Sequence, residues 1–218
     1  MLSQKSEVSE MNRSVLFRQL SDGELKELSA CLCAEEKSFK KNDIITKYQE
    51  NDNKAGIVRS GLAYLISIND SGETSILDYY ESGNIFGQNF SPNTDINLYY
   101  IFAKQNTEVT FYSYDKLISC CDNNCRKHKQ FINNLISCYV SRTQIHIDIL
   151  TQRSIRAKLM TYFRYISRQN NTTAFSLPLS LSDLADYIAA DRSAMMREIK
   201  KMNNENIITS KGSTITLL

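Results

Sequence analysis

Residues near the C-terminus have the types and spacing needed to contact double-stranded DNA. One face of a helix would carry Arg192, Ser193, Met196, Arg197 and Lys200, which recur in steps of one and three residues. Arginine donates paired hydrogen bonds to guanine in the major groove, whereas lysine contacts phosphate oxygens. The opposite face would be apolar and would consist of Met195, Ile199 and Met202. We therefore predict an amphipathic helix whose basic side faces nucleic acid.

The residues that precede this helix have the pattern of a helix–turn–helix. Ser180 and Asp183 have the spacing of a capping box, which predicts a first helix that begins after Ser180. The small residues at positions 189–190 favour a tight turn. Asp191 has the type of an N-cap residue, so the second helix is predicted from Arg192 to about residue 204.

The last residues of the chain favour a wing beside the two helices. Residues 207–217 read as two short strands about a Lys-Gly turn, which would place Lys211 at its tip. Together these features predict a winged helix-turn-helix. The alternative is a structural helical hairpin whose charges are solvated.

The charge of the chain is unevenly distributed. The whole sequence has 26 Lys+Arg and 24 Asp+Glu, and its net charge of +2 favours no partner. Residues 151–218 hold 10 Lys+Arg and 5 Asp+Glu, whereas residues 1–150 hold 16 and 19. A basic segment on an acidic body favours a polyanion as partner. We predict DNA contacts from Ser180, Asp191, Arg192, Ser193, Met196, Arg197, Lys200 and Lys211.

The segment from Phe39 to Tyr114 has the pattern of a β-sandwich or barrel. Short apolar or β-branched runs, separated by turn residues, cover 44–46, 56–58, 62–66, 74–79, 99–103 and 109–112. The Asp-Ser-Gly at 70–72 indicates a hairpin between two of them. A helix is predicted over residues 14–35, with a capping box at Ser21–Glu24. The fold class is therefore predicted to be α+β.

A long helical pattern follows the strands. From about Lys129 to Gln169 there is no Gly or Pro, with a break near residues 151–154. An approximate heptad runs through Ile132, Ile136, Tyr139, Thr143, His146 and Leu150. It favours a helix that pairs with its copy in a homodimer, and the alternative is a long core helix. After the break, one helix face would carry Ile155, Leu159, Tyr162, Phe163 and Ile166.

Four segments resemble the Crp/Fnr family of bacterial transcription regulators. Residues 191–197 (Asp-Arg-Ser-Ala-Met-Met-Arg) resemble the recognition-helix motif, and residues 154–159 resemble the start of the DNA-binding domain. Residues 56–62 and 83–88 resemble two turns of the cyclic-nucleotide-binding-type barrel. The resemblance implies a jelly-roll-like sensor barrel at 1–128, a dimerisation helix at 129–150 and a winged helix-turn-helix at 151–218. It also implies RNA polymerase as a partner.

The departures from the family pattern concern the ligand and the operator. Gln88 stands where nucleotide-binding members have Glu, and Leu98-Tyr99 stand where they have Arg-Ser. Without that Arg no cation is ready for a cyclic phosphate, so we expect an effector other than cyclic AMP or GMP, or none. The candidate effector-contacting residues are Gly83, Gly87, Gln88, Leu98, Tyr99 and Thr143. Ser193 and Met196 replace a usual Glu and Gly or Ser, so the DNA half-site should differ from the familiar TGTGA/TTGAT type.

The cysteines leave three interpretations open. Cys120, Cys121 and Cys125, with His128, have residue types that can ligate a metal or a cluster, but their spacing matches no recognised pair. The same thiols could form a redox switch, or they could be buried and incidental. No metal and no cofactor are therefore assigned.

Other classes of protein are disfavoured. Residues 39–115 contain no His, so a cupin-like metalloenzyme is not expected. No apolar run approaches the about 20 residues that cross a bilayer, and the N-terminus lacks a signal-peptide core. We expect a cytoplasmic, homodimeric DNA-binding regulator gated by an unidentified effector in the barrel. The alternatives are a thiol-switch regulator and an effector-independent DNA-binding protein.

Overall fold

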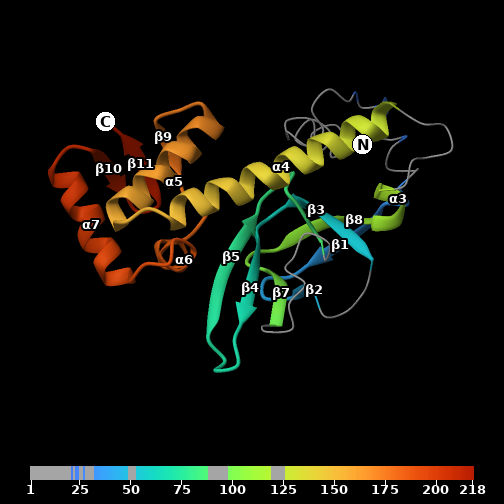
Figure 1. Cartoon of the computed structure of the whole chain (residues 1–218), viewed down its shortest axis with the longest axis horizontal. Coiled ribbons are helices and arrows are strands. Elements are labelled where there is room, and N and C mark those ends of the chain that lie inside the picture. The colour runs from blue at the N-terminus through green and yellow to red at the C-terminus, as the bar shows by residue number, and fades with distance from the viewer. Residues whose placement is uncertain are drawn as a thin grey trace. The chain divides into compact units, whose positions relative to one another are not determined.

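The computed structural model describes residues 21, 23–24, 27, 32–48, 53–87, 98–118 and 126–218. The chain forms two compact units, Met1–Val140 and Ser141–Leu218. Both contain strands and helices (Figure 1), so the predicted α+β class is confirmed. The domain boundaries at residues 128 and 150 remain predictions.

The first unit, called here the barrel unit, is built on two antiparallel four-stranded sheets. The first sheet has the order β1 (Glu35–Phe39), β8 (Thr107–Ser113), β3 (Lys54–Ser60) and β6 (Ile85–Gly87). The second has the order β2 (Ile44–Lys47), β7 (Leu98–Ala103), β4 (Ala63–Ile68) and β5 (Thr74–Tyr80). Strands distant in sequence pair within each sheet, which is typical of a jelly roll.

Aromatic side chains fill part of the barrel core. The Phe86 ring lies 6.1 Å from the Phe111 ring, edge to face, and 5.5 Å from the Tyr80 ring. Phe86 packs so closely over β3 that a Cβ atom on Gly56 would lie 2.4 Å from its Cζ atom. A side chain at position 56 would therefore displace this ring.

The predicted strands are confirmed, but two strands and the end of one helix were missed. Five of the six predicted runs lie wholly in strands, the run 62–66 begins one residue before β4, and β4 and β5 pair as a hairpin across the Asp-Ser-Gly turn. The capping box is confirmed by the backbone N–H of Ser21, which donates to Glu24 Oε2 at 2.8 Å. The helix predicted to residue 35 is wrong at its end, because residues 32–33 lie in a turn and β1 starts at Glu35. The rest of 14–35 lies largely outside the described residues.

The missed strands have few sequence signals. β1 reads Glu-Glu-Lys-Ser-Phe, which has low strand propensity and no apolar alternation. It is held instead by pairing with all of the facing residues of β8, from Phe111 to Thr107. β6 has only 3 residues, too few to show a period.

Three helices follow the barrel strands. α3 covers Tyr114–Ile118, α4 covers Arg126–Leu150 and α5 covers Ile155–Asn170 (Figure 1). The predicted break between α4 and α5 is confirmed, and the Ser154 hydroxyl caps α5 by accepting from the Ala157 N–H at 3.1 Å. No helix in the described ranges is long and apolar enough to cross a membrane.

The second unit, called here the C-terminal unit, has the winged helix-turn-helix arrangement. After α5 come β9 (Ala174–Ser176), α6 (Leu181–Tyr187), α7 (Arg192–Asn204), β10 (Ile208–Lys211) and β11 (Thr214–Leu217). The strands form one sheet in the order β10, β11, β9. Its core is apolar and consists of Leu159, Tyr162, Phe163, Phe175, Leu184, Met195, Ile199, Met202, Ile208 and Ile215.

Candidate nucleic-acid interface

Two predicted site residues, Ser180 and Asp191, form the N-caps of the helix pair. The Ser180 hydroxyl accepts from the Asp183 N–H at 3.2 Å and donates to the Asp183 carboxylate at 2.6 Å. The Asp191 carboxylate accepts from the Ala194 N–H at 2.7 Å. Each cap satisfies an N–H that the helix leaves open, which stabilises the helix by about 1 kcal/mol. These residues therefore define where α6 and α7 begin.

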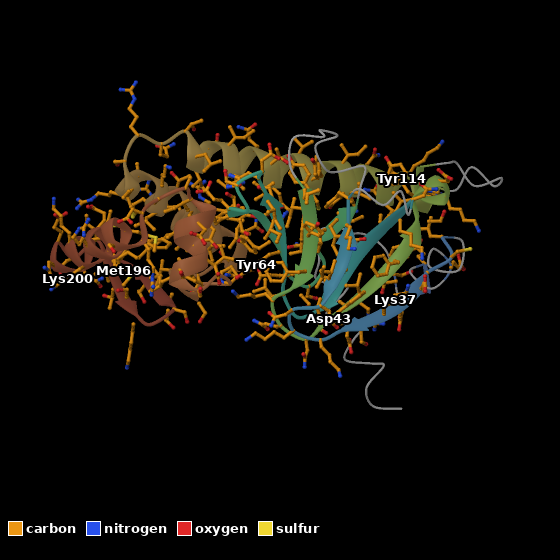
Figure 2. The ribbon with its side chains drawn as sticks, turned by 90° about the horizontal axis from the view of Figure 1, so that it is seen from below. Lys37, Asp43, Tyr64, Tyr114, Met196 and Lys200 are labelled. Carbon is orange, nitrogen blue, oxygen red and sulfur yellow. The ribbon has the colours of Figure 1, made fainter. Side chains whose placement is uncertain are left out.

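The two faces of α7 differ as the sequence predicted. The inner face is buried and consists of Met195, Ile199 and Met202. The outer face is exposed and consists of Arg192, Ser193, Met196, Arg197 and Lys200. Met196 is 39% exposed, although a large apolar side chain gains nothing from water. Figure 2 labels Met196 and Lys200, which both project from α7.

Arg156 of α5 holds two carboxylates, one on α7 and one at the C-cap of α7. Arg156 Nε donates to Glu198 Oε1 at 2.5 Å, and its Nη1 donates to Glu205 Oε2 at 2.6 Å. The hydrogen bonds to Glu205 and then Glu198 raise the pKa of Arg156, and those from Arg156 lower the pKa of Glu205. Arg156 therefore stays charged and neutralises the acidic side chains next to the basic face.

The cations on the exposed face, in contrast, have no carboxylate partner among the residues that the structure describes. Within the part of the chain that the structure describes, no ion pair involves Arg192, Arg197, Lys200 or Lys211. Lys201 lies 4.0 Å from Glu205, at the limit of an ion pair. The surface of α7 and the wing therefore carries uncompensated positive charge, which attracts a polyanion.

The wing is tied to the second helix by one amide side chain. Asn203 Nδ2 donates to Ser210 Oγ at 2.7 Å and to the Ile199 carbonyl at 2.8 Å. The Ser210 N–H donates back to Asn203 Oδ1 at 2.7 Å. Lys211 follows Ser210 directly and is exposed at the end of β10. Asn203 thus fixes the strand that carries Lys211.

Arg156 and Asn203 are the residues that sequence reasoning missed. Arg156 lay within the segment that resembles the start of the DNA-binding domain, but its partners are 42 and 49 residues away. The capping and helical patterns report only neighbours within about four residues, so these long-range contacts leave no local signal.

The glycines predicted to contact an effector lie around β6. Gly83 has φ +82° in the turn before β6, and its N–H donates to the Val58 carbonyl at 2.8 Å. A Cβ on Gly87 would lie 3.0 Å from the Lys54 carbonyl oxygen, so Gly87 permits a close approach of β3. Gln88 lies outside the described residues. These glycines shape the turn and the strand, and their effector role stays a prediction.

The remaining effector candidates lie in different surroundings within their own units. Leu98 is 47% exposed and Tyr99 is 7% exposed, because successive residues of β7 face opposite sides of the sheet. Thr143 is exposed on α4 and belongs to the C-terminal unit. Their proposed contact with a ligand stays untested.

The candidate metal or redox cysteines cannot be placed. Cys120, Cys121 and Cys125 lie outside the described residues. His128 is buried on α4, and its Nε2 lies 2.6 Å from the Leu117 carbonyl, to which it donates. Within the described ranges no three His, Cys, Asp or Glu side chains gather as a metal site.

The residues of the predicted heptad on α4 differ in exposure, and the predicted pairing with a second copy stays a prediction. The large exposed apolar residues of the helix are Ile136, Tyr139, Val140, Ile147 and Leu150. His146 is half-buried instead, with Nε2 2.9 Å from the Tyr187 carbonyl and its ring stacked on Tyr187 at 4.1 Å. The exposed stripe therefore passes through Val140 and Ile147 in place of His146.

Known proteins with the same arrangement are transcription regulators. Residues 36–124 match the cyclic nucleotide-binding domain family. The anaerobic regulatory protein of Haemophilus influenzae is 21% identical over 204 residues, which cover 91% of this chain and 78% of that protein.

Two solved structures share the fold at low sequence identity. FixK2 of Bradyrhizobium japonicum aligns with a TM-score of 0.67 and 17% identity, over 84% of this chain and 92% of that one. A regulator assigned to the Crp/Fnr family, from Eubacterium rectale, aligns with a TM-score of 0.58 and 15% identity, over 95% and 94%.

Residues 36–124 thus form a cyclic nucleotide-binding-type domain, and the relatives that these comparisons name as regulators are not enzymes. The resemblance to the Crp/Fnr family that the sequence motifs indicated is thereby confirmed.

Proposed function

We propose that this protein is a homodimeric transcription regulator that binds double-stranded DNA sequence-specifically. The observation that carries the proposal is that two acidic side chains at α7 form ion pairs, whereas the basic side chains of its exposed face do not, within the described residues. Glu198 of α7 and Glu205 at its C-cap pair with Arg156. Within the described residues, the cations of the exposed face have no ion-pair partner and are available to phosphate and base edges. A helix end of this kind fits the major groove.

Each residue of the interface has a role that its position supports. Arg192 and Ser193 open α7, where side chains of a recognition helix meet base edges. Arg197 lies one turn further along the same face and donates to a base or a phosphate. Lys200 and Lys211 contact the phosphate backbone. Asp191, because it caps α7, supports the interface from behind.

The operator should differ from the familiar family half-site. Ser193 has a hydroxyl where the family has a carboxylate, so it does not select a cytosine amino group in the same way. Met196 presents an exposed methyl-bearing side chain, which suits contact with the C5-methyl group of thymine. Selection of the unchanged TGTGA/TTGAT consensus would contradict this proposal.

The exposed apolar face of α4 supports the homodimer. An apolar stripe at intervals of three and four residues gains free energy when it packs against its copy. Two recognition helices would then meet half-sites about 34–36 Å apart. Replacing Val140 with Glu should yield monomers in analytical ultracentrifugation, whereas Ser141→Glu on the flank should not.

An effector other than a cyclic nucleotide is proposed to gate DNA binding. Two cations of β3 are already paired, because Lys54 contacts Glu35 and Arg59 contacts Glu36. Phe86, in the core between the sheets, favours an apolar ligand over an anionic one. Thermal-shift screening of the dimer against metabolites, nucleotides and redox agents tests this. A uniform absence of response would favour effector-independent binding.

Selection of duplexes from a random pool by the full-length protein tests the central proposal. We expect a defined palindromic sequence, and we expect Arg197→Ala to weaken binding to it by about tenfold or more without lowering the unfolding temperature. Arg164→Ala removes a charge from the exposed side of α5 and serves as control. Enrichment of no sequence, or full binding by Arg197→Ala, would refute the assignment. RNA polymerase is the proposed protein partner at the promoter.

A further inference from the structure

The turn between α6 and α7 is held in an unusual backbone conformation. Ala189 has φ +49°, a left-handed value that costs an alanine about 1 kcal/mol. The Ala189 N–H donates to the Asp186 carbonyl at 3.0 Å, and the Ala190 N–H donates to the Ala185 carbonyl at 2.9 Å. These bonds are those of a Schellman motif, which usually has glycine at the left-handed position.

Two basic side chains from other helices bind the carbonyls that this motif leaves open. His146 Nε2, on α4, lies 2.9 Å from the Tyr187 carbonyl and donates to it, since a carbonyl oxygen only accepts. Lys158 Nζ, on α5, donates to the Ile188 carbonyl at 2.8 Å and to the Ala189 carbonyl at 3.2 Å. Three consecutive carbonyls of the turn thus have side-chain donors. We call His146 and Lys158 the turn clamp.

The clamp is supported by packing as well as by hydrogen bonds. The His146 ring lies parallel to the Tyr187 ring at 4.1 Å, and Tyr187 contacts the Tyr162 ring at 5.8 Å. Tyr187 and Ile188 are buried, so a carbonyl without a donor there would carry an uncompensated desolvation cost. Positive charge also suits the C-terminal end of α6, where the helix dipole is negative.

We propose that His146 and Lys158 are positioning residues for DNA recognition. The last of the three clamped residues, Ala189, lies two positions before Asp191, the N-cap of α7, so their backbone sets the direction in which the recognition helix starts. Neither side chain needs to touch DNA. The clamp also joins α4, the helix with the exposed apolar stripe, to the turn. This inference rests on the proposed DNA-binding function.

The test compares donor-removing and donor-keeping variants of the full-length protein. His146→Leu and Lys158→Met remove the donors, whereas His146→Gln and Lys158→Arg keep one within reach. Arg164→Met removes a charge from α5 outside the clamp and serves as the matched control. Binding to the selected operator and to a scrambled duplex is measured at several salt concentrations, and hydrogen exchange is measured at the amides of residues 189–195.

We expect the donor-removing variants to lose about tenfold in operator affinity and less than about twofold in scrambled-duplex affinity, because the phosphate-contacting cations remain. Their amides at 189–195 should exchange faster. The donor-keeping variants should recover operator affinity to within about threefold of the wild type. If Lys158→Met does not fold, His146→Leu, which removes the other donor of the clamp, should by itself show the loss of operator affinity.

The outcomes separate the two proposals. If the wild type selects an operator and the donor-removing variants keep its operator-to-scrambled ratio, only the positioning role is refuted. If Lys158→Arg and His146→Gln lose as much as the donor-removing variants, the hydrogen bonds are not what positions α7. If the wild type selects no duplex, the proposed function fails and the positioning role falls with it.

Discussion

The two units of this protein use their charged residues in opposite ways. In the barrel unit, Lys37 and Lys54 both contact Glu35. In the C-terminal unit, one cation, Arg156, pairs with two carboxylates, Glu198 of α7 and Glu205 at its C-cap. In the barrel unit one carboxylate thus pairs with two cations, whereas in the C-terminal unit one cation pairs with two carboxylates. What remains in the second case is a surface with spare positive charge.

This difference shows that the location of ion pairs is more informative than net charge. A surface ion pair contributes little to stability, so neither arrangement is explained by folding energy. Removing negative charge from beside a basic face has a larger consequence, because the field at that face then favours an anion. The pairing of Arg156 is therefore best explained by what α7 must bind.

Replacing the ion-paired arginine of each unit should change operator affinity very differently, and this is the largest difference that we expect between the two units. Arg156→Met frees Glu198 and Glu205 beside the phosphate-facing surface, and like charges across an interface repel. We expect a loss of at least about tenfold in operator affinity, measured by fluorescence anisotropy. Arg59→Met breaks the pair with Glu36 in the barrel unit and should leave affinity unchanged.

A second variant separates charge from positioning in that experiment. Adding Glu198→Gln to Arg156→Met removes one of the two freed charges and should restore part of the affinity. If the double variant binds as weakly as Arg156→Met, then repulsion is not the cause, and Arg156 acts by holding α7 against α5.

The exposed apolar side chains of the two units should also differ. Met196 on α7 is proposed to contact a thymine methyl group, whereas Ile44 on β2 is exposed on the barrel unit. Replacing the operator thymine with deoxyuridine removes only that methyl group. For the wild type we expect a loss of about fourfold, the worth of one buried methyl-sized group. For Met196→Ala the same replacement should cost nothing further.

The two changes, Met196→Ala and thymine to deoxyuridine, form a double-mutant cycle. It tests whether their effects on operator affinity are coupled. If deoxyuridine weakens the wild type and Met196→Ala equally at every thymine, Met196 does not read the methyl group. Ile44→Ala serves as the control and should show the wild-type response.

Sequence patterns predicted the local features of this molecule and missed the long-range ones. The caps at Ser180 and Asp191, the two faces of α7 and six strands follow from spacing within a few residues. The pairing of β1 and the contacts of Arg156 depend on partners distant in sequence. His146 fitted the heptad by spacing alone, but its nitrogen donates to a carbonyl 41 residues away.

The left-handed residues of the two units predict a difference in stability. In the barrel unit Asn42 has φ +73°, and asparagine tolerates this region, whereas Ala189 does not. Ala189→Gly should therefore raise the free energy of unfolding by about 0.5–1 kcal/mol, measured by urea denaturation. Asn42→Gly should change it by less. Ala190→Gly, which only adds chain entropy, should lower it, and a loss of stability in Ala189→Gly would contradict the strain argument.

The smallest expected effect concerns the acid titration of one glutamate in each unit. Hydrogen bonds from Lys54 and then Lys37 lower the pKa of Glu35, and the hydrogen bond from Arg156 lowers that of Glu205, both below the ordinary 4.5. A lowered folded-state pKa adds stability above the ordinary value, and this is lost as pH falls through the lowered one. NMR titration of the carboxyl carbons should show both groups titrating below 4.5.

Variants test whether the neighbouring lysines and arginine cause the lowered pKa values of Glu35 and Glu205. Arg156→Met should raise the pKa of Glu205 toward its ordinary value, with Lys201 still lowering it, and should leave the pKa of Glu35 low. Lys54→Met should raise the pKa of Glu35 in part, since Lys37 still contacts Glu35, and should leave that of Glu205 low. Salt should weaken the shift of Glu35 in particular, because its partners are two flexible lysines, whereas a forked guanidinium holds Glu205 through Nη1 and Nη2. Equal salt sensitivity at the two sites would show that the geometry of the Arg156 fork adds nothing to its charge.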